Sequence, residues 1–212
     1  MILIIGAMAS ETLEISHLIQ NPDNFTLNGK NVVTGEINGH SVMIMTTGVG
    51  KVNAAFGLTS VLSSYDVSYV INVGLVGGFK PLNPGDMVLV KEVTYHDFNL
   101  SMFGYEKGQV PQMPTFYQPN SELVNKVQQK LNLPEVKLYT GDTFLTEPIE
   151  DKSICDMEGA AYFQVAHLLN TKMISVKIIS DIVGEPSQLE DYTAFENACS
   201  FRFKSLIEKL LS

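Results

Sequence analysis

Three carboxylates stand where a hydrophobic stretch of the sequence gives way to a turn or a helix: Glu11, Glu158 and Asp181. Asp181 follows the apolar, β-branched run 174–179, which is typical of a buried strand. Cleavage of a glycosidic bond needs such a set, because one group protonates the leaving group and another activates water. Each acid also fits a simpler role in a turn or in the first turn of a helix, so their value depends on whether the fold brings them together.

Two glycine-rich turns, 47–51 and 74–78, are further candidates for a binding function. Neither is a phosphate loop, since the first lacks the four-residue spacer of a Walker motif and neither contains Gly-x-Gly-x-x-Gly. Gly77 and Gly78 would let the backbone approach a planar base, although a plain strand-to-helix turn explains them equally well.

The residue types that bind metals or act as nucleophiles are scattered. The four histidines include no pair at the helical i, i+4 spacing, and Cys155 and Cys199 are the only cysteines. We therefore expect no metal site and no cofactor, and we interpret Cys155 as a core thiol and not as a nucleophile.

Short apolar strands alternate with helical patterns along the chain. Strands are expected at 2–5, 69–73, 87–94, 136–140, 153–157 and 174–179, with a hairpin of 31–37 and 41–46. Helices are expected at 10–20, 52–64, 120–131, 158–169 and 192–211. The alternation predicts one domain, 1–212, with a three-layer α/β/α architecture around a central, mostly parallel, twisted mixed sheet. The strand ends of such a sheet would build one pocket.

Composition limits the kinds of partner. The chain carries a net charge of −9, and its 14 Lys and Arg residues form no dense cluster, which is the opposite of a nucleic-acid binder. No apolar run reaches the ~18 residues of a membrane helix, and the first ten residues favour a strand over a signal peptide. With two cysteines, we expect a reduced, cytoplasmic protein that binds a small molecule and neither nucleic acid nor membrane.

Eight segments, in the same order along the chain, resemble the methylthioadenosine/S-adenosylhomocysteine nucleosidases of the purine nucleoside phosphorylase/nucleosidase superfamily. They are residues 4–11, 47–55, 71–78, 95–97, 103–114, 141–144, 156–161 and 179–181. Each is a modest signal alone, but together they span nearly the whole chain. The resemblance implies a phosphorylase/hydrolase-like fold, cleavage of the N-glycosidic bond of an adenine nucleoside, and a homodimer in which the 97–117 loop contributes to the partner's pocket.

The resemblance also implies roles for individual residues. Asp181 is the general acid that protonates the purine N7, Glu11 holds and activates the attacking water, and Glu158 hydrogen-bonds the ribose hydroxyls. The other residues implied at the substrate are Met8 and Met157 at the sugar, Phe144, Leu145 and Gly77 at the base, Ser180 next to the acid, and either Tyr192 or Phe195 closing over the base. Those implied to line the 5′-substituent pocket of the neighbouring subunit are Met102, Phe103 and Pro111.

The sequence departs from the family pattern at several positions. Leu75 stands where these nucleosidases usually have Ser, Lys177 where they have Arg, Asp156 where they have Glu, and Gly159 where they have Ala. The stretch between 144 and 156 is also several residues shorter than usual. The glycine at position 159 resembles the pattern of the futalosine hydrolases, which release hypoxanthine.

The nucleophile and the exact activity have alternatives. Phosphorylases of the superfamily hold phosphate with several arginines, whereas this chain has Arg202 alone, so the sequence favours water. A futalosine-type hydrolase and a phosphorylase are the alternative enzymes. A non-catalytic nucleoside-binding protein on the same scaffold is the alternative outside the enzymes.

Overall fold

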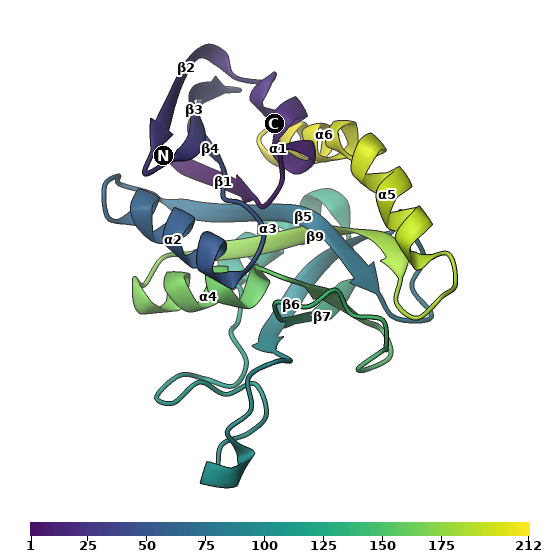
Figure 1. Ribbon diagram of the computed structural model, residues 1–212. Helices are drawn as coiled ribbons and strands as arrows, with labels where there is room; N and C mark the ends of the chain where they lie inside the picture. The colour runs from purple at the N-terminus through teal and green to yellow at the C-terminus, as the bar shows by residue number, and fades with distance from the viewer.

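The computed structural model describes the backbone of residues 1–212 and the side chains of all residues except 197 and 198. These residues form a nine-stranded mixed sheet with helices on both faces (Figure 1). The strands are β1 (Ile2–Gly6), β2 (Gln20–Leu27), β3 (Lys30–Ile37), β4 (His40–Thr46), β5 (Tyr69–Gly78), β6 (Met87–Tyr95), β7 (Glu135–Thr140), β8 (Ser153–Asp156) and β9 (Met173–Ile182). The helices are α1 (Ala9–Ser16), α2 (Lys51–Leu62), α3 (Ser121–Leu131), α4 (Gly159–Leu168), α5 (Gln188–Ala198) and α6 (Ser200–Leu210), with a short 3-10 helix, η1 (Ser101–Phe103).

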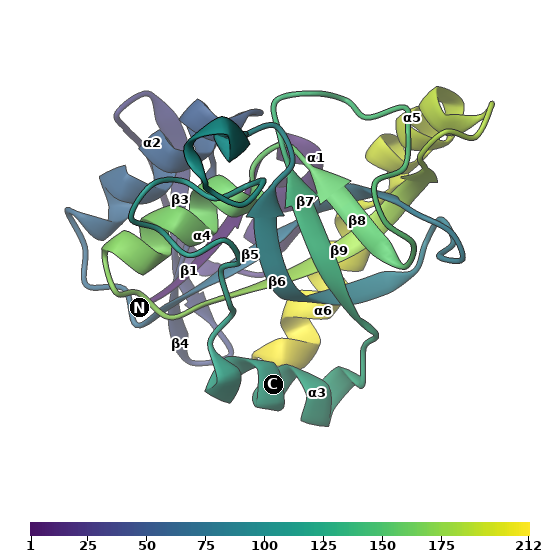
Figure 2. The same ribbon diagram turned by 90° about the horizontal axis from the view of Figure 1, so that it is seen from below.

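The sheet has the strand order β2-β3-β4-β1-β5-β8-β7-β6-β9, and β9 returns to pair with β5. Strand β5 therefore bonds to three neighbours: β1 and β9 in parallel and, through Gly77 and Gly78, β8 antiparallel. Strands β5, β8, β7, β6 and β9 close on themselves, which gives the strong twist visible in Figure 2. The predicted mixed sheet, with parallel and antiparallel pairings, is confirmed.

The predicted three layers are confirmed as well. Helices α2 and α4 pack on one face of the sheet, where Leu58 and Tyr162 are buried in one hydrophobic cluster. Helices α1, α3 and α6 cover the other face around a second cluster that contains Ile15 and Leu206 (Figures 1 and 2). Because both faces of the sheet are covered, every residue of β1 and β9 is buried, and neither strand alternates between buried apolar and exposed polar residues.

The expected helix 10–20 is wrong in its second half. Helix α1 ends at Ser16, and residues from Gln20 onward form β2, an edge strand that pairs antiparallel with β3. Most residues of β2 are exposed, so no apolar periodicity marks the strand in the sequence. Its backbone is held by the partner strand, and a register shift near Asn21, which has a positive φ of 52°, accommodates the irregular start.

The expected helix 192–211 is two helices. Helix α5 begins earlier, at Gln188, and the chain bends at Cys199 before α6. The start was missed because the preceding turn contains Pro186, although Ser187 and Glu190 follow the capping-box pattern; in the structure the Ser187 side chain makes no capping hydrogen bond. None of the helices formed by the described residues combines the length and the apolar character needed to cross a membrane.

Candidate active site

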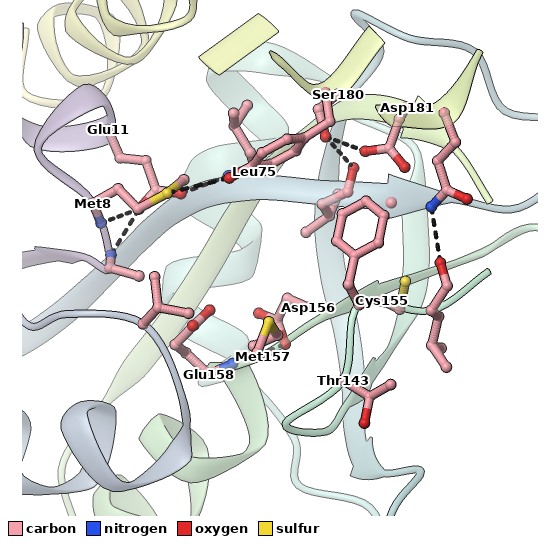
Figure 3. A pocket seen from close by; sticks show the side chains of 18 residues that line it. Met8, Glu11, Leu75, Thr143, Cys155, Asp156, Met157, Glu158, Ser180 and Asp181 are labelled. Atoms are coloured by element: carbon pink, nitrogen blue, oxygen red, sulfur yellow. Dashed lines mark hydrogen bonds between the residues drawn. The ribbon is translucent and has the colours of Figure 1, made fainter. Parts of the chain in front are cut away.

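The three acids singled out in the sequence lie around one cavity at an edge of the sheet. Glu11 is in the first turn of α1, Glu158 links β8 to α4, and Asp181 is the penultimate residue of β9. All three are buried and line the same cavity. Figure 3 shows them approaching it from different sides. The fold therefore brings together side chains that are up to 170 residues apart in the sequence, counted from 11 to 181.

Glu11 is held by the backbone on both carboxylate oxygens. Its Oε2 accepts hydrogen bonds from the amides of Ala7 (2.7 Å) and Met8 (3.0 Å), and its Oε1 accepts from the amide of Leu75 (2.9 Å). Burial raises the pKa of Glu11, while the nearby Lys177 ammonium and these three amides oppose the rise. The carboxylate is thus fixed in position, where it can accept a proton from a molecule in the cavity.

Asp181 has one satisfied oxygen and one free oxygen. Its Oδ1 lies 2.5 Å from the Ser180 hydroxyl, whereas its Oδ2 is buried without a hydrogen-bond partner among the described residues. Burial raises the pKa of Asp181, and the Ser180 hydrogen bond only partly offsets this. A Cβ atom on Gly77 would lie 2.8 Å from Val183 Cγ2 and 3.0 Å from Cys155 Sγ, so glycine is needed for the close packing of β5 beside Asp181. These features suit a carboxylic acid that donates its proton from Oδ2.

Glu158 completes the set from the side of α2. The amide of Gly50, at the N-cap of α2, donates to its Oε1 (2.7 Å). Burial and the neighbouring Asp156 carboxylate raise the pKa of Glu158 to about 7. Among the described residues no protein group bonds to its second oxygen and competes with a ligand hydroxyl, so the side chain can act as a hydrogen-bond acceptor or, when protonated, as a donor.

A buried ion pair lies behind these acids. The Lys177 ammonium is 3.0 Å from Asp156 Oδ2, and both side chains are only 2% exposed. Asp156 also accepts from the Thr140 hydroxyl (2.6 Å) and the Gly159 amide (3.0 Å). A Cβ atom on Gly74 would lie 3.0 Å from Lys177 Nζ and 3.1 Å from Glu11 Oε1, so Gly74 makes room for both groups.

Replacing Lys177 by methionine should destabilise the fold strongly. The substitution would leave Asp156 buried without its counter-ion, which typically costs about 3–5 kcal/mol. Urea unfolding of Lys177→Met measures the loss. Lys172→Met is the matched control, because the Lys172–Glu122 pair is 53% and 70% exposed, and exposed pairs contribute at most about 1 kcal/mol. Equal losses in the two variants would contradict a structural role for the buried pair.

Ten of the fourteen residues selected from the sequence line the cavity. Besides the three acids they are Met8, Gly77, Phe144, Leu145, Met157, Ser180 and Tyr192. The Tyr192 ring stands edge-on to Phe144 at 5.7 Å, and its hydroxyl lies 3.4 Å from Met8 Sδ. Phe195 does not line the cavity. It packs instead with the hydrophobic cluster of α1 and α6 and lies near Gly85, so of these two residues only Tyr192 is placed at the cavity.

Three of the selected residues lie outside the cavity of their own chain. Met102, Phe103 and Pro111 belong to the 97–117 loop, which extends away from the sheet (Figure 1). Met102 is 97% exposed and Phe103 is 77% exposed. Within one chain they therefore contact no part of the candidate site.

Several cavity residues were not selected from the sequence. They are Ala7, Val49, Leu75, Val76, Thr143, Cys155, Asp156 and Gln188. Burial raises the pKa of Cys155, which makes it an unreactive thiol. No Lys or Arg side chain lines the cavity, and no group of three or more His, Cys, Asp or Glu among the described residues is arranged to hold a metal.

The sequence and the fold correspond to a known class of protein. The sequence profile of the Phosphorylase superfamily matches residues 1–212. The 5′-methylthioadenosine/S-adenosylhomocysteine nucleosidase of Pseudoalteromonas translucida (strain TAC 125) is 38% identical, over 98% of this chain and 96% of the relative. The chain therefore belongs to the methylthioadenosine/S-adenosylhomocysteine nucleosidase family of that superfamily.

Solved structures agree with this membership. The nucleosidase of this family from Colwellia psychrerythraea, in complex with adenine, superposes with a TM-score of 0.92 at 30% identity and covers 99% of this chain and 93% of that one. The Streptococcus pneumoniae nucleosidase, in complex with 8-aminoadenine, gives a TM-score of 0.92 at 26% identity, with 99% and 98% covered.

Proposed function

We propose that this protein is a hydrolase that cleaves the N-glycosidic bond of adenine nucleosides such as 5′-methylthioadenosine and S-adenosylhomocysteine. The products are adenine and the 5-substituted ribose. The observation that carries the proposal is the convergence of Glu11, Glu158 and Asp181 on one cavity, in a chain whose relatives are named for this activity.

The chemistry follows from the state of each acid. Protonated Asp181 donates from Oδ2 to N7 of the departing purine, which leaves as a neutral base while the sugar develops positive charge. Ionised Glu11 orients a water molecule and accepts its proton as the water attacks the anomeric carbon. Glu158 hydrogen-bonds the ribose hydroxyls, and its negative charge together with that of Glu11 stabilises the cationic sugar.

The apolar part of the cavity positions the substrate. Phe144 stacks on the base, Tyr192 closes over it, and Leu145 and Gly77 lie beside it, while Met8 and Met157 pack on the sugar. Leu75 presents an apolar side chain where related nucleosidases usually carry Ser, but its amide keeps the bond to Glu11. The hydrogen bond from the amide of Leu75 that helps to fix Glu11, the proposed general base, is therefore independent of the side chain at position 75.

Water is favoured over phosphate as the nucleophile. The single arginine, Arg202, donates to the carbonyl of Gly85 and does not line the cavity. Lys177 is already paired with Asp156. A phosphate dianion in this cavity would meet four carboxyl groups, those of Glu11, Asp156, Glu158 and Asp181, and no free cation from a lining side chain.

The experiment is an assay of base release from a panel of nucleosides, with and without phosphate. We expect free adenine from methylthioadenosine at a rate that phosphate does not change. Release of hypoxanthine from futalosine alone would favour the futalosine-type alternative. A strict phosphate requirement would favour a phosphorylase, and binding without turnover would favour a non-catalytic nucleoside-binding protein.

The 97–117 loop supports a homodimer as part of the proposal. Its exposed Met102 and Phe103, and the exposed Val52 and Phe56 on α2, are large apolar side chains that a second copy would cover. In the dimer, Met102, Phe103 and Pro111 line the 5′-substituent pocket of the neighbouring subunit. We further propose that residues 1–212 act as one domain in the cytoplasm, in keeping with two free, buried cysteines.

Replacing Phe103 by serine should raise KM for methylthioadenosine about tenfold with little change in kcat, because burial of an aromatic side chain contributes roughly 1.5–3 kcal/mol. Steady-state kinetics measure the effect. Phe201→Ser is the matched control, since Phe201 is 65% exposed on α6 and lies outside the loop. An unchanged KM in Phe103→Ser would contradict the shared pocket.

A further inference from the structure

Gln188 is a buried cavity residue to which the proposed reaction assigns no role. It is the first residue of α5 and is only 7% exposed. Its Oε1 accepts a hydrogen bond from the amide of Gly184 (3.0 Å), and its Nε2 donates to the carbonyl of Leu145 (2.8 Å). Because one backbone partner is a donor and the other an acceptor, the side-chain amide has a single orientation.

The two partners of Gln188 belong to the segments that flank the base-binding end of the cavity. Gly184 lies three residues after Asp181, in a turn that needs its positive φ of 83°. Leu145 directly follows Phe144. The two segments approach closely, since a Cβ atom on Gly184 would lie 3.3 Å from the carbonyl oxygen of Thr146. Gln188 thus joins the segment that carries the proposed acid to the segment that carries the proposed stacking ring.

Gln188 also contributes to the electrostatics of the acid. Burial raises the pKa of Asp181, and the Ser180 hydroxyl and the Gln188 side chain, which lines the same cavity, oppose that rise. Nε2 has a second N–H in addition to the one given to Leu145, and it makes no hydrogen bond to Asp181, whose Oδ2 has no hydrogen-bond partner among the described residues. A neutral donor at this place limits how far the buried carboxyl group favours its protonated form.

We propose that Gln188 is a positioning residue for the nucleosidase reaction, which fastens the Leu145 segment to the Gly184 turn and thereby holds Asp181 and Phe144 in register with the purine. The inference rests on the proposed function, because it takes Asp181 as the acid. It assigns Gln188 no direct contact with the reacting atoms.

The test compares Gln188→Met and Gln188→Glu with the wild-type protein in kcat, KM and the pH profile of kcat/KM. Methionine keeps the volume and removes both hydrogen bonds. Glutamate keeps an acceptor for the Gly184 amide, so it preserves the turn, but it loses the donor and places a negative charge near Asp181. We expect kcat to fall about ten- to a hundredfold in both, the usual effect of a misplaced catalytic group.

The pH profile distinguishes a positioning role of Gln188 from a purely stabilising one. Loss of the Gln188 donor should move the basic limb of kcat/KM, set by Asp181, to higher pH, and the added charge of Gln188→Glu should move it further than Gln188→Met does. The matched control is Gln128→Met. Gln128 makes a similar pair of bonds, from Nε2 to the Leu133 carbonyl (2.9 Å) and from the Leu133 amide to Oε1 (2.8 Å), but on α3 outside the cavity.

Each outcome is decisive. Lower kcat per folded molecule with the ordered shift of the basic limb, and neither effect in Gln128→Met, supports the proposal. A lower Tm with wild-type kcat and an unmoved limb overturns it, since Gln188 would then be structural only. If Gln188→Met fails to fold, kcat of Gln188→Glu decides: a fall per folded molecule that Gln128→Met does not show supports the proposal, and a wild-type kcat overturns it. If the wild-type protein releases no adenine, the proposed function itself is wrong. The assay of the wild-type protein alone detects this outcome.

Discussion

Replacing Asp181 by asparagine is expected to lower kcat by about 10³-fold or more while leaving the fold intact. Loss of a general acid alone costs roughly 10²–10⁴-fold, and the amide also cannot stabilise a departing anionic base by full proton transfer. Asn keeps the shape of Asp and can still accept from the Ser180 hydroxyl, which lies 2.5 Å from Oδ1. The measurement is adenine release under single-turnover conditions, with thermal unfolding as the check on folding.

The pH dependence gives the same substitution a second readout. Burial raises the pKa of Asp181, so the group stays protonated to higher pH than an ordinary aspartate, and kcat/KM should fall as pH rises through that pKa. The raised pKa also favours the folded state at low pH, and this contribution is lost as pH rises through the folded-state pKa. In Asp181→Asn the basic limb of the activity profile should disappear together with the corresponding change in stability.

Asp191→Asn is the control for the loss of a carboxylate near the site. Asp191 lies on α5, bonds to the Ser187 hydroxyl (2.8 Å) and does not line the cavity. Because its charge raises the pKa of Asp181, the variant should move the basic limb slightly to lower pH and keep its kcat within about threefold of wild type. Near-normal turnover in Asp181→Asn would refute the assignment of the acid.

The layers of the fold and the three acids could be predicted from the sequence, because each is marked by a pattern within a short segment of the chain. The buried strands are long apolar runs, and Glu11, Glu158 and Asp181 stand at their ends, where an α/β sheet forms its pocket. Family resemblance then supplied roles that spacing alone left open. Strand β2 escaped prediction because its residues are mostly exposed and it depends on pairing with β3.

The features that the sequence did not reveal depend on tertiary contacts. The Lys177–Asp156 pair joins neighbouring parts of the sheet, and nothing in either segment marks the other as its partner. Gln188 was missed because the helix was expected to begin only at residue 192, and because its two partners are backbone groups, which any residue supplies. To choose between Tyr192 and Phe195, one must know which face of α5 is turned toward the cavity. That orientation is set by the packing of the helix and not by its weakly amphipathic sequence.

Replacing Glu11 by glutamine is expected to reduce kcat to a comparable extent, through two effects that act together. Glutamine cannot accept the proton of the attacking water, so general-base assistance is lost. It also has only one acceptor oxygen, whereas Glu11 accepts from amides on both oxygens. Its NH₂ group must face at least one backbone N–H, which should lower the free energy of unfolding by roughly 1–3 kcal/mol.

The acidic limb of kcat/KM identifies the base. Burial raises the pKa of Glu11, with Lys177 and three backbone amides opposing the rise, and the base must be ionised to act, so activity should increase as pH rises through this pKa. Glu11→Gln should abolish that limb along with most of the turnover. Glu14→Gln on the same helix is the control, because Glu14 pairs with His17 (3.3 Å) and Lys204 (3.8 Å) and does not line the cavity. Turnover within tenfold of wild type in Glu11→Gln would show that water is activated by another group. Glu158 would then be the next carboxylate to test, since it borders the same cavity with a pKa raised to about 7.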